Sequence, residues 1–250
     1  MNSLQGRLHP SACGDDHLLR TPCAGVAVRP LTGTMKTGSF TQDARGRWYV
    51  NLHCEVPDAA EPTGQCDIGI DLGLKNQITC SDGIIYSREN LTRQHAQPLA
   101  MAQRAQKKRR AKALQAKMAN IRKDWTHKAT TAIARRAKLL VIGNVSSTKL
   151  VKTPFATSTY DAAWGMVRHQ LTYKAKRLAG VCVAGNERFS SVTCSGCGIR
   201  SGPSGLSALG VRAWVCSGCG VEHDRDVNAA RNILALRSGR ATPIKGIPVL

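Results

Sequence analysis

The chain has 250 residues, which is enough for one or two domains with a hydrophobic core. Lysine and arginine number 36 against 16 aspartates and glutamates, so the formal charge is +20. A surface this basic repels itself unless a polyanion neutralises it. Nucleic acid is the usual polyanion, and an anionic lipid surface is the alternative. No apolar stretch reaches the roughly 18 residues that cross a bilayer, and no secretory signal pattern opens the chain, so we expect no membrane span.

The first part of the chain predicts one hairpin and little other regular structure. Residues 1–35 show no clear periodicity and carry proline, glycine and isolated charges, so we expect a poorly ordered segment or one foreign to the rest. Residues 39–42 and 47–54 are typical of two strands, joined by a turn at 43–46 in which glycine supplies a positive φ. A linker follows at 58–64.

The middle of the chain alternates between strands and helices. Residues 66–72 alternate apolar with polar or small side chains, and 77–80 and 84–87 predict two further strands around a Ser-Asp-Gly turn. A long helical stretch covers about 94–138 and holds thirteen basic residues but a single acid, Asp124. The apolar run at 139–145 then predicts a buried strand.

The last part predicts a helix at 161–178 closed by Gly180, a strand at 181–184 and a final helix at 227–237. Three strands, a helical insertion, a strand, a helix, a strand and a helix follow one another in an RNase H-like α/β fold. We therefore predict that fold, with a core in which Trp125 and Trp164 are buried rather than free to stack on bases.

Ten cysteines are present, and four of them form the pattern C-x2-C-x18-C-x2-C, namely Cys194, Cys197, Cys216 and Cys219. Thiolates at this spacing can surround one ion as a closed tetrahedron, which predicts a structural Zn²⁺ site; four free thiols are the alternative. His223 lies outside the pattern, and we expect a residue at a helix entry rather than a ligand. The six scattered cysteines are typical of reduced thiols.

Acidic residues far apart in the chain form the second candidate site. Phosphodiester cleavage by two cations needs several carboxylates that converge on ions about 4 Å apart. Asp71 ends a predicted strand, before Gly73, which would let a nucleic-acid backbone approach closely; a strand-end turn is the alternative role. Asp67 lies about 13 Å along the same strand and cannot share that site. Asp226 precedes the final helix, where capping competes with metal binding, and Asp224 is the alternative carboxylate.

Several motifs together resemble one family. They are GIDLG around Asp71, the four-cysteine segment, DRDVNAARNIL at 224–234 and NIRKDWTHK at 120–128. Over about residues 38–236 the chain is similar to the insertion-sequence OrfB/TnpB family, transposon-encoded relatives of type V CRISPR effectors. The resemblance implies a RuvC-like nuclease domain, DNA cleavage with two Mg²⁺ ions, a transposon-derived guide RNA and a cytoplasmic, nucleoid-associated protein. Asp71 would be the first catalytic acid of the family pattern and Asp226 the last.

The chain departs from this family in two respects. Members carry a middle glutamate on the strand equivalent to 139–145, where this chain has Gly143 and Asn144. Glu187 ends the next strand, about 4.8 Å away, and resembles the branch in which the middle acid has moved; a surface glutamate paired with Arg188 is the alternative. Asp161, at a helix start, is the only acid between Trp125 and Asn186. The other departure is length, because members usually have a longer N-terminal half, of which only the last strands, at 38–56, are recognisable in this sequence.

The basic helical stretch predicts contacts with nucleic-acid phosphates, and a solvated charged face is the alternative. These contacts would not depend on base sequence. The residues expected to make them are Lys107, Lys108, Arg109, Arg110, Arg122, Lys123 and Lys128.

The leading hypothesis is an RNA-guided DNA endonuclease with Asp71, Glu187 and Asp226 as Mg²⁺ ligands. A catalytically inactive, truncated nucleic-acid-binding protein is the second hypothesis, and a zinc-ribbon module with a protein partner is the third.

The expected division of the chain is a non-family segment at 1–35, a remnant β domain and linker at 36–64, an RNase H-like core at 65–193 with the insertion at 90–138, a zinc ribbon at 194–222, the last core helix at 223–238 and a tail at 239–250.

Overall fold

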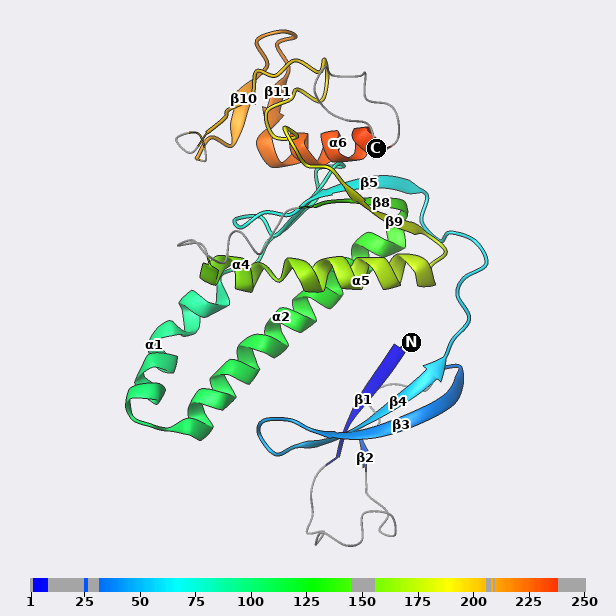
Figure 1. Ribbon diagram of the computed structural model, residues 1–250, viewed down its shortest axis with the longest axis vertical. Coiled ribbons are helices and arrows are strands. Elements are labelled where there is room, and N and C mark those ends of the chain that lie inside the picture. The colour runs from blue at the N-terminus through cyan, green and yellow to red at the C-terminus, as the bar shows by residue number, and fades with distance from the viewer. Residues whose placement is uncertain are drawn as a thin grey trace, which may run out of the picture. The chain divides into compact units, whose positions relative to one another are not determined.

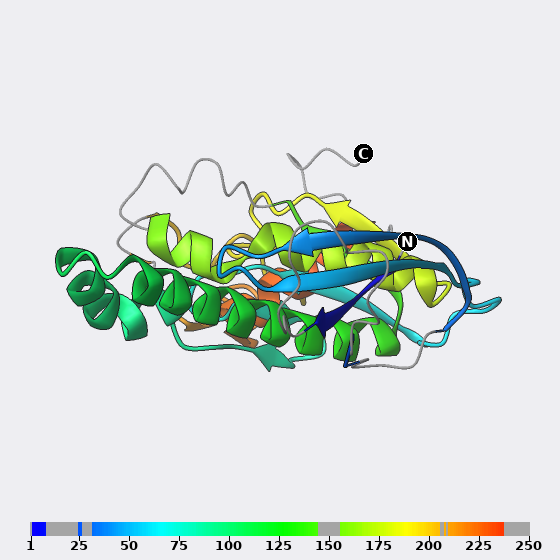
Figure 2. The ribbon, with the colours of Figure 1, turned by 90° about the horizontal axis from the view of Figure 1, so that it is seen from below.

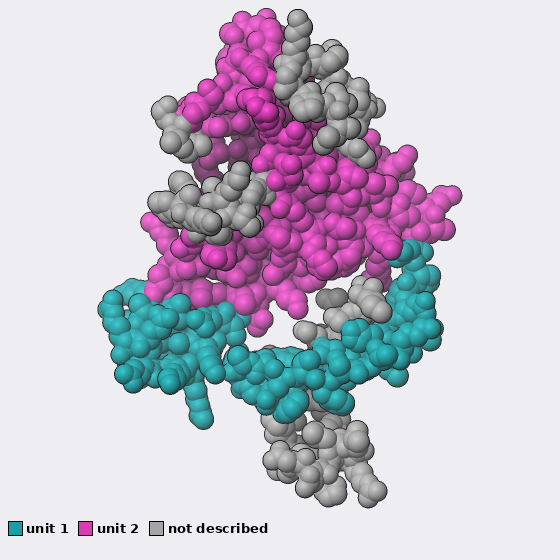
Figure 3. All heavy atoms as spheres, viewed as in Figure 1, with its two compact units in different colours: residues 1–58, 97–117 teal, residues 59–96, 118–250 magenta. Residues whose placement is uncertain are grey.

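The computed structural model describes residues 32–144, 156–205, 208 and 210–237, together with strands at 2–8 and 25–26. The chain forms two compact units, one of residues 1–58 and 97–117, the other of residues 59–96 and 118–250 (Figure 3). Within the described ranges, no helix combines the length and apolarity that crossing a membrane requires.

The first unit contains an antiparallel sheet with strand order β2-β1-β4-β3. Its hairpin is the predicted one, since Asp43 and Arg47 close the turn by a backbone hydrogen bond of 2.9 Å and Gly46 has a φ of 79°. The segment expected to be poorly ordered supplies two strands of this sheet. The strands are β1 (Asn2–Leu8), β2 (Gly25–Val26), β3 (Thr34–Gln42) and β4 (Trp48–Glu55).

The second unit is built on a five-stranded mixed sheet with strand order β7-β6-β5-β8-β9. Strands β5, β8 and β9 are parallel, so their carboxyl ends meet at one edge, whereas β6 and β7 run antiparallel. The predicted strands are thus present, in the order β5 (Cys66–Asp71), β6 (Ile78–Cys80), β7 (Ile85–Tyr86), β8 (Ala137–Gly143) and β9 (Val181–Gly185).

Helices cover both faces of this sheet (Figure 1). On one face, Ile133 of α2 (Lys108–Arg136) and Leu171 of α5 (Trp164–Arg177) share a core with Ile70 of β5. On the other face lies α6 (Arg225–Arg237), so close to β5 that a Cβ at Gly69 would be 2.1 Å from the carbonyl oxygen of Ala230. Glycine is required there because any side chain would push α6 off the sheet.

The long helical stretch is a hairpin of two helices, α1 (Leu91–Arg104) and α2, rather than the single stretch that the sequence predicts (Figures 1 and 2). Gln106 has a φ of 51°, and the amide of Lys107 donates to the carbonyl of Ala102 at 2.9 Å, which is a Schellman helix end. This end is hard to predict because glycine, the usual residue at this position, is absent.

The helix predicted at 161–178 is also divided. Ala163, with a φ of 55°, separates α4 (Ala156–Ala162) from α5. Trp164 is 2% exposed and Trp125 packs against the same core, as predicted. Residues 194–224 form a small subdomain with a two-stranded sheet of β10 (Ala213–Val215) and β11 (Glu222–Asp224).

Candidate functional site

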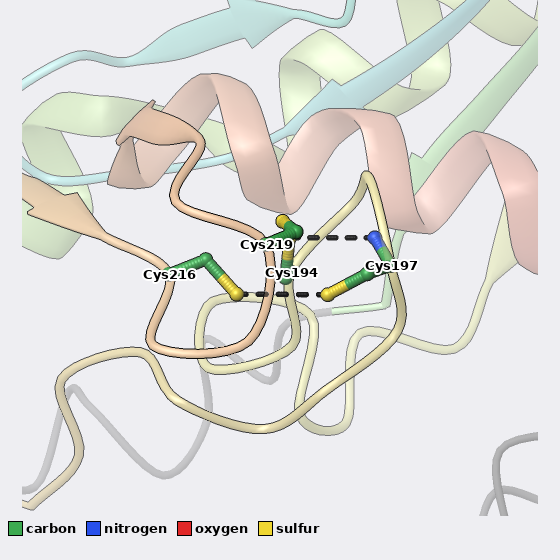
Figure 4. Close-up of side chains that lie close together, drawn as sticks. All are labelled: Cys194, Cys197, Cys216 and Cys219. Carbon is green, nitrogen blue, oxygen red and sulfur yellow. Dashed lines mark hydrogen bonds between the residues drawn. The ribbon is translucent and has the colours of Figure 1, made fainter.

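The four predicted cysteines converge, with all their sulfur atoms within 4.8 Å of one another (Figure 4). Cys194 and Cys219 are 3.6 Å apart at Sγ, and so are Cys197 and Cys216. A zinc ion with sulfur ligands at about 2.3 Å would place tetrahedral sulfurs about 3.8 Å apart. The cluster therefore has the dimensions of a single closed four-sulfur metal site.

The backbone around the cysteines is shaped for such a site. Gly198 and Gly220, each directly after the second cysteine of a pair, have φ values of 80° and 72°. These positive values turn the chain back over the sulfurs at little steric cost. Ser201 donates its hydroxyl to Cys216 Sγ at 3.2 Å, and this hydrogen bond lowers the pKa of the Cys216 thiol to about 5. The cluster thus favours one thiolate before any metal arrives.

His223 lies at this cluster, which the sequence did not predict. It belongs to β11 and is 3% exposed, with Nε2 3.0 Å from Cys194 Sγ and its ring centroid 4.6 Å from that of Trp214. The strand period of β11 turns this side chain inward between two exposed neighbours. The sequence predicted that His223 would lie at a helix entry. Instead, His223 lies next to the sulfur atoms without belonging to the group of four cysteines.

The second site lies at the carboxyl ends of the parallel strands. Asp71 is the last residue of β5 and is half-buried. Burial, followed by the charges of Asp226 and Glu187, raises the pKa of the Asp71 carboxyl to about 7. Two acids that lie 116 and 155 positions further along the chain therefore act on Asp71 through space. The three predicted acids meet in one environment.

Glu187 occupies the space above Gly143, at the end of the strand on which the family pattern has its middle glutamate. A Cβ built on Gly143 would lie 2.9 Å from Glu187 Oε2. The register explains this placement, because Gly143 of β8 pairs with Gly185 of β9 and Glu187 follows two residues later. Asn144 accepts a hydrogen bond of 3.4 Å from the Glu187 amide at Oδ1 and so fixes the backbone there.

Asp226 and Asp224 have separate roles. Asp224 Oδ1 accepts hydrogen bonds from the amides of Asp226 and Val227 at 3.0 and 2.9 Å, so Asp224 is the N-cap of α6. The sequence placed capping and metal binding in competition at Asp226. Instead, Asp226 lies in the first turn, and its carboxylate does not cap the helix because the residue two positions earlier does so.

Two residues that the sequence did not predict hold the Asp226 carboxylate. Asn76 Nδ2 donates to Oδ2 at 2.9 Å, and Arg212 Nη1 contacts Oδ1 and Oδ2 at 3.0 and 3.3 Å. Arg212 directly precedes β10, so the cysteine-containing subdomain reaches the acidic site. Neither residue has a sequence signal beyond its type, because the fold alone brings it to Asp226.

Gly73 has a different role from the one predicted. A Cβ at Gly73 would lie 2.6 Å from the carbonyl oxygen of Asn76, so glycine is needed for the tight loop that follows β5. Trp164 Nε1 donates to the Gly73 carbonyl at 3.1 Å and anchors the same loop. The glycine thus positions Asn76 near Asp226, and the prediction that it accommodates nucleic acid is replaced by this packing role.

The three carboxylates are less closely grouped than the four cysteines. Among the described residues, only the four cysteines have all their ligand atoms within 4.8 Å of one another, so the three acids do not form a tight single-ion cage. Two ions about 4 Å apart, each with oxygen ligands at about 2.1 Å, accept ligands up to about 8 Å apart. The donor set of carboxylate oxygens suits hard cations such as Mg²⁺.

Asp161 and Arg122 lie away from this site. Asp161 is 2% exposed and accepts hydrogen bonds from Thr92 N at 2.8 Å and from Arg122 Nη2 at 2.6 Å. Arg122 was predicted to contact nucleic acid, but its guanidinium is used in this buried ion pair, which fastens α2 to α4. The other predicted basic residues of the helical hairpin are exposed, and Lys128 makes an exposed ion pair with Asp124 at 2.7 Å.

Comparisons with known proteins agree with this arrangement. Residues 51–153 match the profile of a transposase family described as "Probable transposase", OrfB_IS605, and residues 164–233 match "Cas12f1-like, TNB domain". A "Putative RNA-guided DNA endonuclease" of Streptomyces pristinaespiralis is 35% identical over 213 residues, which is 80% of this chain and 52% of the relative. A "Putative RNA-guided DNA endonuclease InsQ" of Escherichia coli is 29% identical over 237 residues, 83% of this chain and 58% of the relative.

The chain thus spans about half the length of the curated relatives that it matches. Among solved structures, the protein in the "Cryo-EM structure of the Cas12f1-sgRNA-target DNA complex" aligns with a TM-score of 0.51 at 21% identity, over 76% of this chain and 54% of that one. This likeness shows a shared α/β fold.

Proposed function

We propose that this chain belongs to the insertion-sequence OrfB/TnpB family and is a transposon-associated, RNA-guided DNA endonuclease that hydrolyses phosphodiester bonds. The observation that carries the proposal is the position of Glu187. Its carboxylate fills the space above Gly143, beside an Asp71 whose pKa responds to both Glu187 and Asp226.

We also propose a domain organisation for this function. The five-stranded sheet with α2, α5 and α6 would be an RNase H-like core of residues 65–193 and 223–238, since its strand order and parallel strands suit that fold. Residues 194–222 would be a zinc ribbon, and residues 36–64 a remnant of an N-terminal β domain.

In this proposal Asp71, Glu187 and Asp226 would hold two Mg²⁺ ions. When bound, such ions activate water for in-line attack and stabilise the leaving oxygen. Asp71 lies at the strand end, where burial and its two acidic neighbours make it ready to bind cations. The pKa of about 7 also means that protons compete with cations for this carboxylate near neutral pH.

Other side chains would orient the acids. Asn76 and Arg212 fix the Asp226 carboxylate, and Asn144 fixes the backbone of Glu187. Outer residues of this kind typically change metal affinity or activity by about 10–100-fold. The Oδ1 atom of Asp226 has a second lone pair for a cation, so Arg212 could keep its contacts and would lie beside the bound ions.

The cysteine cluster would hold a structural Zn²⁺ that positions the acidic site. Asn228 of α6 accepts a hydrogen bond from the amide of Ser195 at 2.9 Å and donates to the carbonyl of Thr193 at 2.7 Å. Asn228 is 1% exposed and lies two residues after Asp226. The first cysteine knuckle is therefore joined directly to the helix turn that carries a catalytic acid.

The exposed basic residues of the helical hairpin would contact the phosphates of DNA or of a transposon-derived guide RNA. They carry positive charge without base specificity, as expected when a guide RNA reads the sequence. They are Lys107, Lys108, Arg109, Arg110, Lys123 and Lys128.

The direct test is to purify the protein, extract and sequence any bound RNA, and assay Mg²⁺-dependent cleavage of matching DNA with the same preparation. We expect bound RNA from the transposon end and cleavage that requires Asp71. Recovery of RNA without cleavage under Mg²⁺ or Mn²⁺ would contradict the enzymatic proposal.

That outcome would favour the second candidate function, a catalytically inactive nucleic-acid-binding protein of the same family. The observation in its favour is that Gly143 and Asn144 stand at the end of the strand on which the family pattern has its middle glutamate. It predicts salt-sensitive binding of nucleic acid that is unchanged when Asp71 is replaced by asparagine.

A further inference from the structure

The loop after β9 holds an aromatic residue in an unusual backbone conformation. Phe189 has a φ of 63°, a region that bulky L-residues rarely adopt. Its carbonyl accepts hydrogen bonds from the amides of Val192 and Thr193 at 3.1 and 3.0 Å, and the amide of Ser190 donates to the carbonyl of Glu187 at 3.1 Å. These bonds form a tight turn that begins at Glu187.

Helix α6 fastens this turn to the core. The side-chain amides of Asn228 and Asn232 each donate to the carbonyls of Ser190 and Thr193, at distances between 2.7 and 3.1 Å. Four such bonds from one helix face over-determine the turn, and this is how a strained conformation persists. Strain of this kind is characteristic of functional sites, so the position of the Phe189 ring calls for an explanation.

Two arginines lie over the Phe189 ring. The guanidinium carbon of Arg188 lies 4.8 Å from the ring centroid of Phe189, and that of Arg200 lies 4.0 Å from it. A backbone bridge between Thr193 and Arg200 brings Arg200 back to the loop from the cysteine-containing subdomain. Both arginines are exposed, and they are held no more than about 9 Å apart because they share one ring.

Two like charges held this close repel each other unless an anion lies near both. Arginine is suited to phosphate because its planar group can donate two hydrogen bonds to the oxygens. Glu187, a proposed metal ligand, directly precedes Arg188, so their Cα atoms are about 3.8 Å apart. Arg188 is thus the chain neighbour of a proposed catalytic acid, and Arg200 is held beside it over the same ring.

We propose that Arg188, Phe189 and Arg200 form a phosphate clamp that binds the backbone of single-stranded DNA beside the acidic site. The phosphates would lie between the exposed guanidinium groups, and the Phe189 ring would hold those groups in position through its contacts with both. This inference rests on the proposed nuclease function, because that function supplies the DNA strand. The clamp reads no bases, so it would act on any sequence that the guide RNA exposes.

The test is a binding assay that does not need cleavage. Fluorescence anisotropy of a labelled 20-nucleotide DNA strand is measured with an Asp71→Asn protein over a series of salt concentrations. Each arginine that no longer binds a phosphate lowers the slope of log affinity against log salt by about 0.7 for a single strand. Removing both arginines (Arg188→Ala with Arg200→Ala) should therefore lower the slope by about 1.4 and weaken binding about tenfold or more near physiological salt.

Two further variants separate charge from position. Phe189→Leu keeps both charges, so we expect binding to weaken about threefold while the salt slope falls much less than in the double variant. Arg177→Ala removes an exposed arginine at the end of α5, outside the helical hairpin, and as the matched control it should change neither quantity appreciably. Circular dichroism and zinc content establish that each variant is folded.

A double variant that is folded and keeps the parent's slope would overturn the clamp. A loss confined to single-stranded RNA of the same sequence would also overturn it, since the site would then belong to the guide. The outcome is separate from that of the proposed function. A protein that fails to cleave DNA can still show a clamp-dependent slope, and a protein that cleaves DNA can lack it.

Discussion

The cysteine cluster and the acidic site are neighbours in this fold, yet they are assembled in opposite ways. The cysteines come in two pairs, each within one short turn, and the second pair lies in the loop between β10 and β11. The acids come from positions 71, 187 and 226 and meet only when β5, β8, β9 and α6 are all in place. A local sequence pattern therefore forms the cysteine cluster, whereas the fold of the whole second unit forms the acidic site.

The two sites also differ in how they behave without a metal. In the cysteine cluster, hydrogen bonds from Ser201 and backbone amides stabilise sulfur charge, and the pKa of Cys216 is low. In the acidic site, burial and like charge raise the pKa of Asp71. A backbone hydrogen bond of Ile199 lowers the pKa of the Cys197 thiol, but desolvation and the neighbouring sulfurs outweigh it and raise that pKa to about 12, so the cluster favours one thiolate rather than four. Both sites therefore hold repulsion that cations can relieve, and they differ in that four sulfurs would enclose one ion completely, whereas the acids would leave ions open to substrate.

Replacing a carboxylate in the acidic site should have the largest effect on cleavage. Asp71→Asn or Asp226→Asn removes a charged ligand, so we expect DNA cleavage to fall by more than about 100-fold, beyond the usual effect of residues that only support a ligand. Asp67→Asn is the matched control, because Asp67 lies on the same strand and is exposed. Initial rates on labelled DNA measure the effect. Equal loss in the control would mean that the strand, and not the site, was damaged.

Replacing a cysteine should damage stability first and cleavage second. Cys194→Ser is expected to abolish zinc binding and to lower the free energy of unfolding by about 3 kcal/mol or more, since structural zinc contributes directly to folding. Cleavage should fall as well, because Asn228 joins the first knuckle to the helix that carries Asp226. Zinc content and thermal unfolding measure this change. The control is Cys66→Ser, at an exposed cysteine of β5.

Moving the middle carboxylate from residue 187 to residue 143 tests whether cleavage needs a carboxylate in this space or Glu187 itself. Glu187→Ala should lower cleavage by about 100-fold if Glu187 is a ligand. Adding Gly143→Glu places a carboxylate on the strand where the family pattern has it, and the space is vacated because Glu187 Oε2 was the nearest atom to a Cβ there. We expect the double variant to recover at least about tenfold, whereas Gly143→Ala with Glu187→Ala should not recover. Full activity of Glu187→Ala alone would return Glu187 to the role of a surface residue.

The contrast between the two sites also explains what the sequence could predict. The four cysteines are recognisable because their spacing is local, and the strands are recognisable from short periodic runs. Asp71 and Glu187 are recognisable as strand-end acids. Arg212 and Asn76 are not, since nothing in their neighbourhoods shows that the fold brings them to Asp226.

The errors have the same origin. Asp226 and Asp224 both suit a helix N-terminus by type, and only the observed hydrogen bonds show that Asp224 caps. Arg122 belonged by composition to a basic surface, and its partner Asp161 lies 39 positions away, in another helix. Gln106 and Ala163 divide the predicted helices although neither is a glycine. The errors at Asp226 and Arg122 concern hydrogen-bond partners that the residue type does not reveal. The errors at Gln106 and Ala163 concern a backbone conformation that the residue type does not reveal.

The smallest expected effect is on stability as a function of pH, and it tests the stored repulsion itself. The native pKa of Asp71 is about 7, above its ordinary value of 3.8, so the native protein retains a proton that the unfolded chain releases. The stabilisation is fully present below about pH 4 and is lost as the pH rises through about 7. Asp71→Asn has no such proton, so in the absence of metal its advantage over the parent should grow across this range, to about 2 kcal/mol or a few degrees in Tm.

Thermal unfolding in a chelator that spares bound zinc measures the difference, and Mg²⁺ should reduce it by stabilising only the parent. A difference that stays constant between about pH 4 and about pH 8 would show that burial and the two neighbouring acids do not raise the pKa of the Asp71 carboxyl.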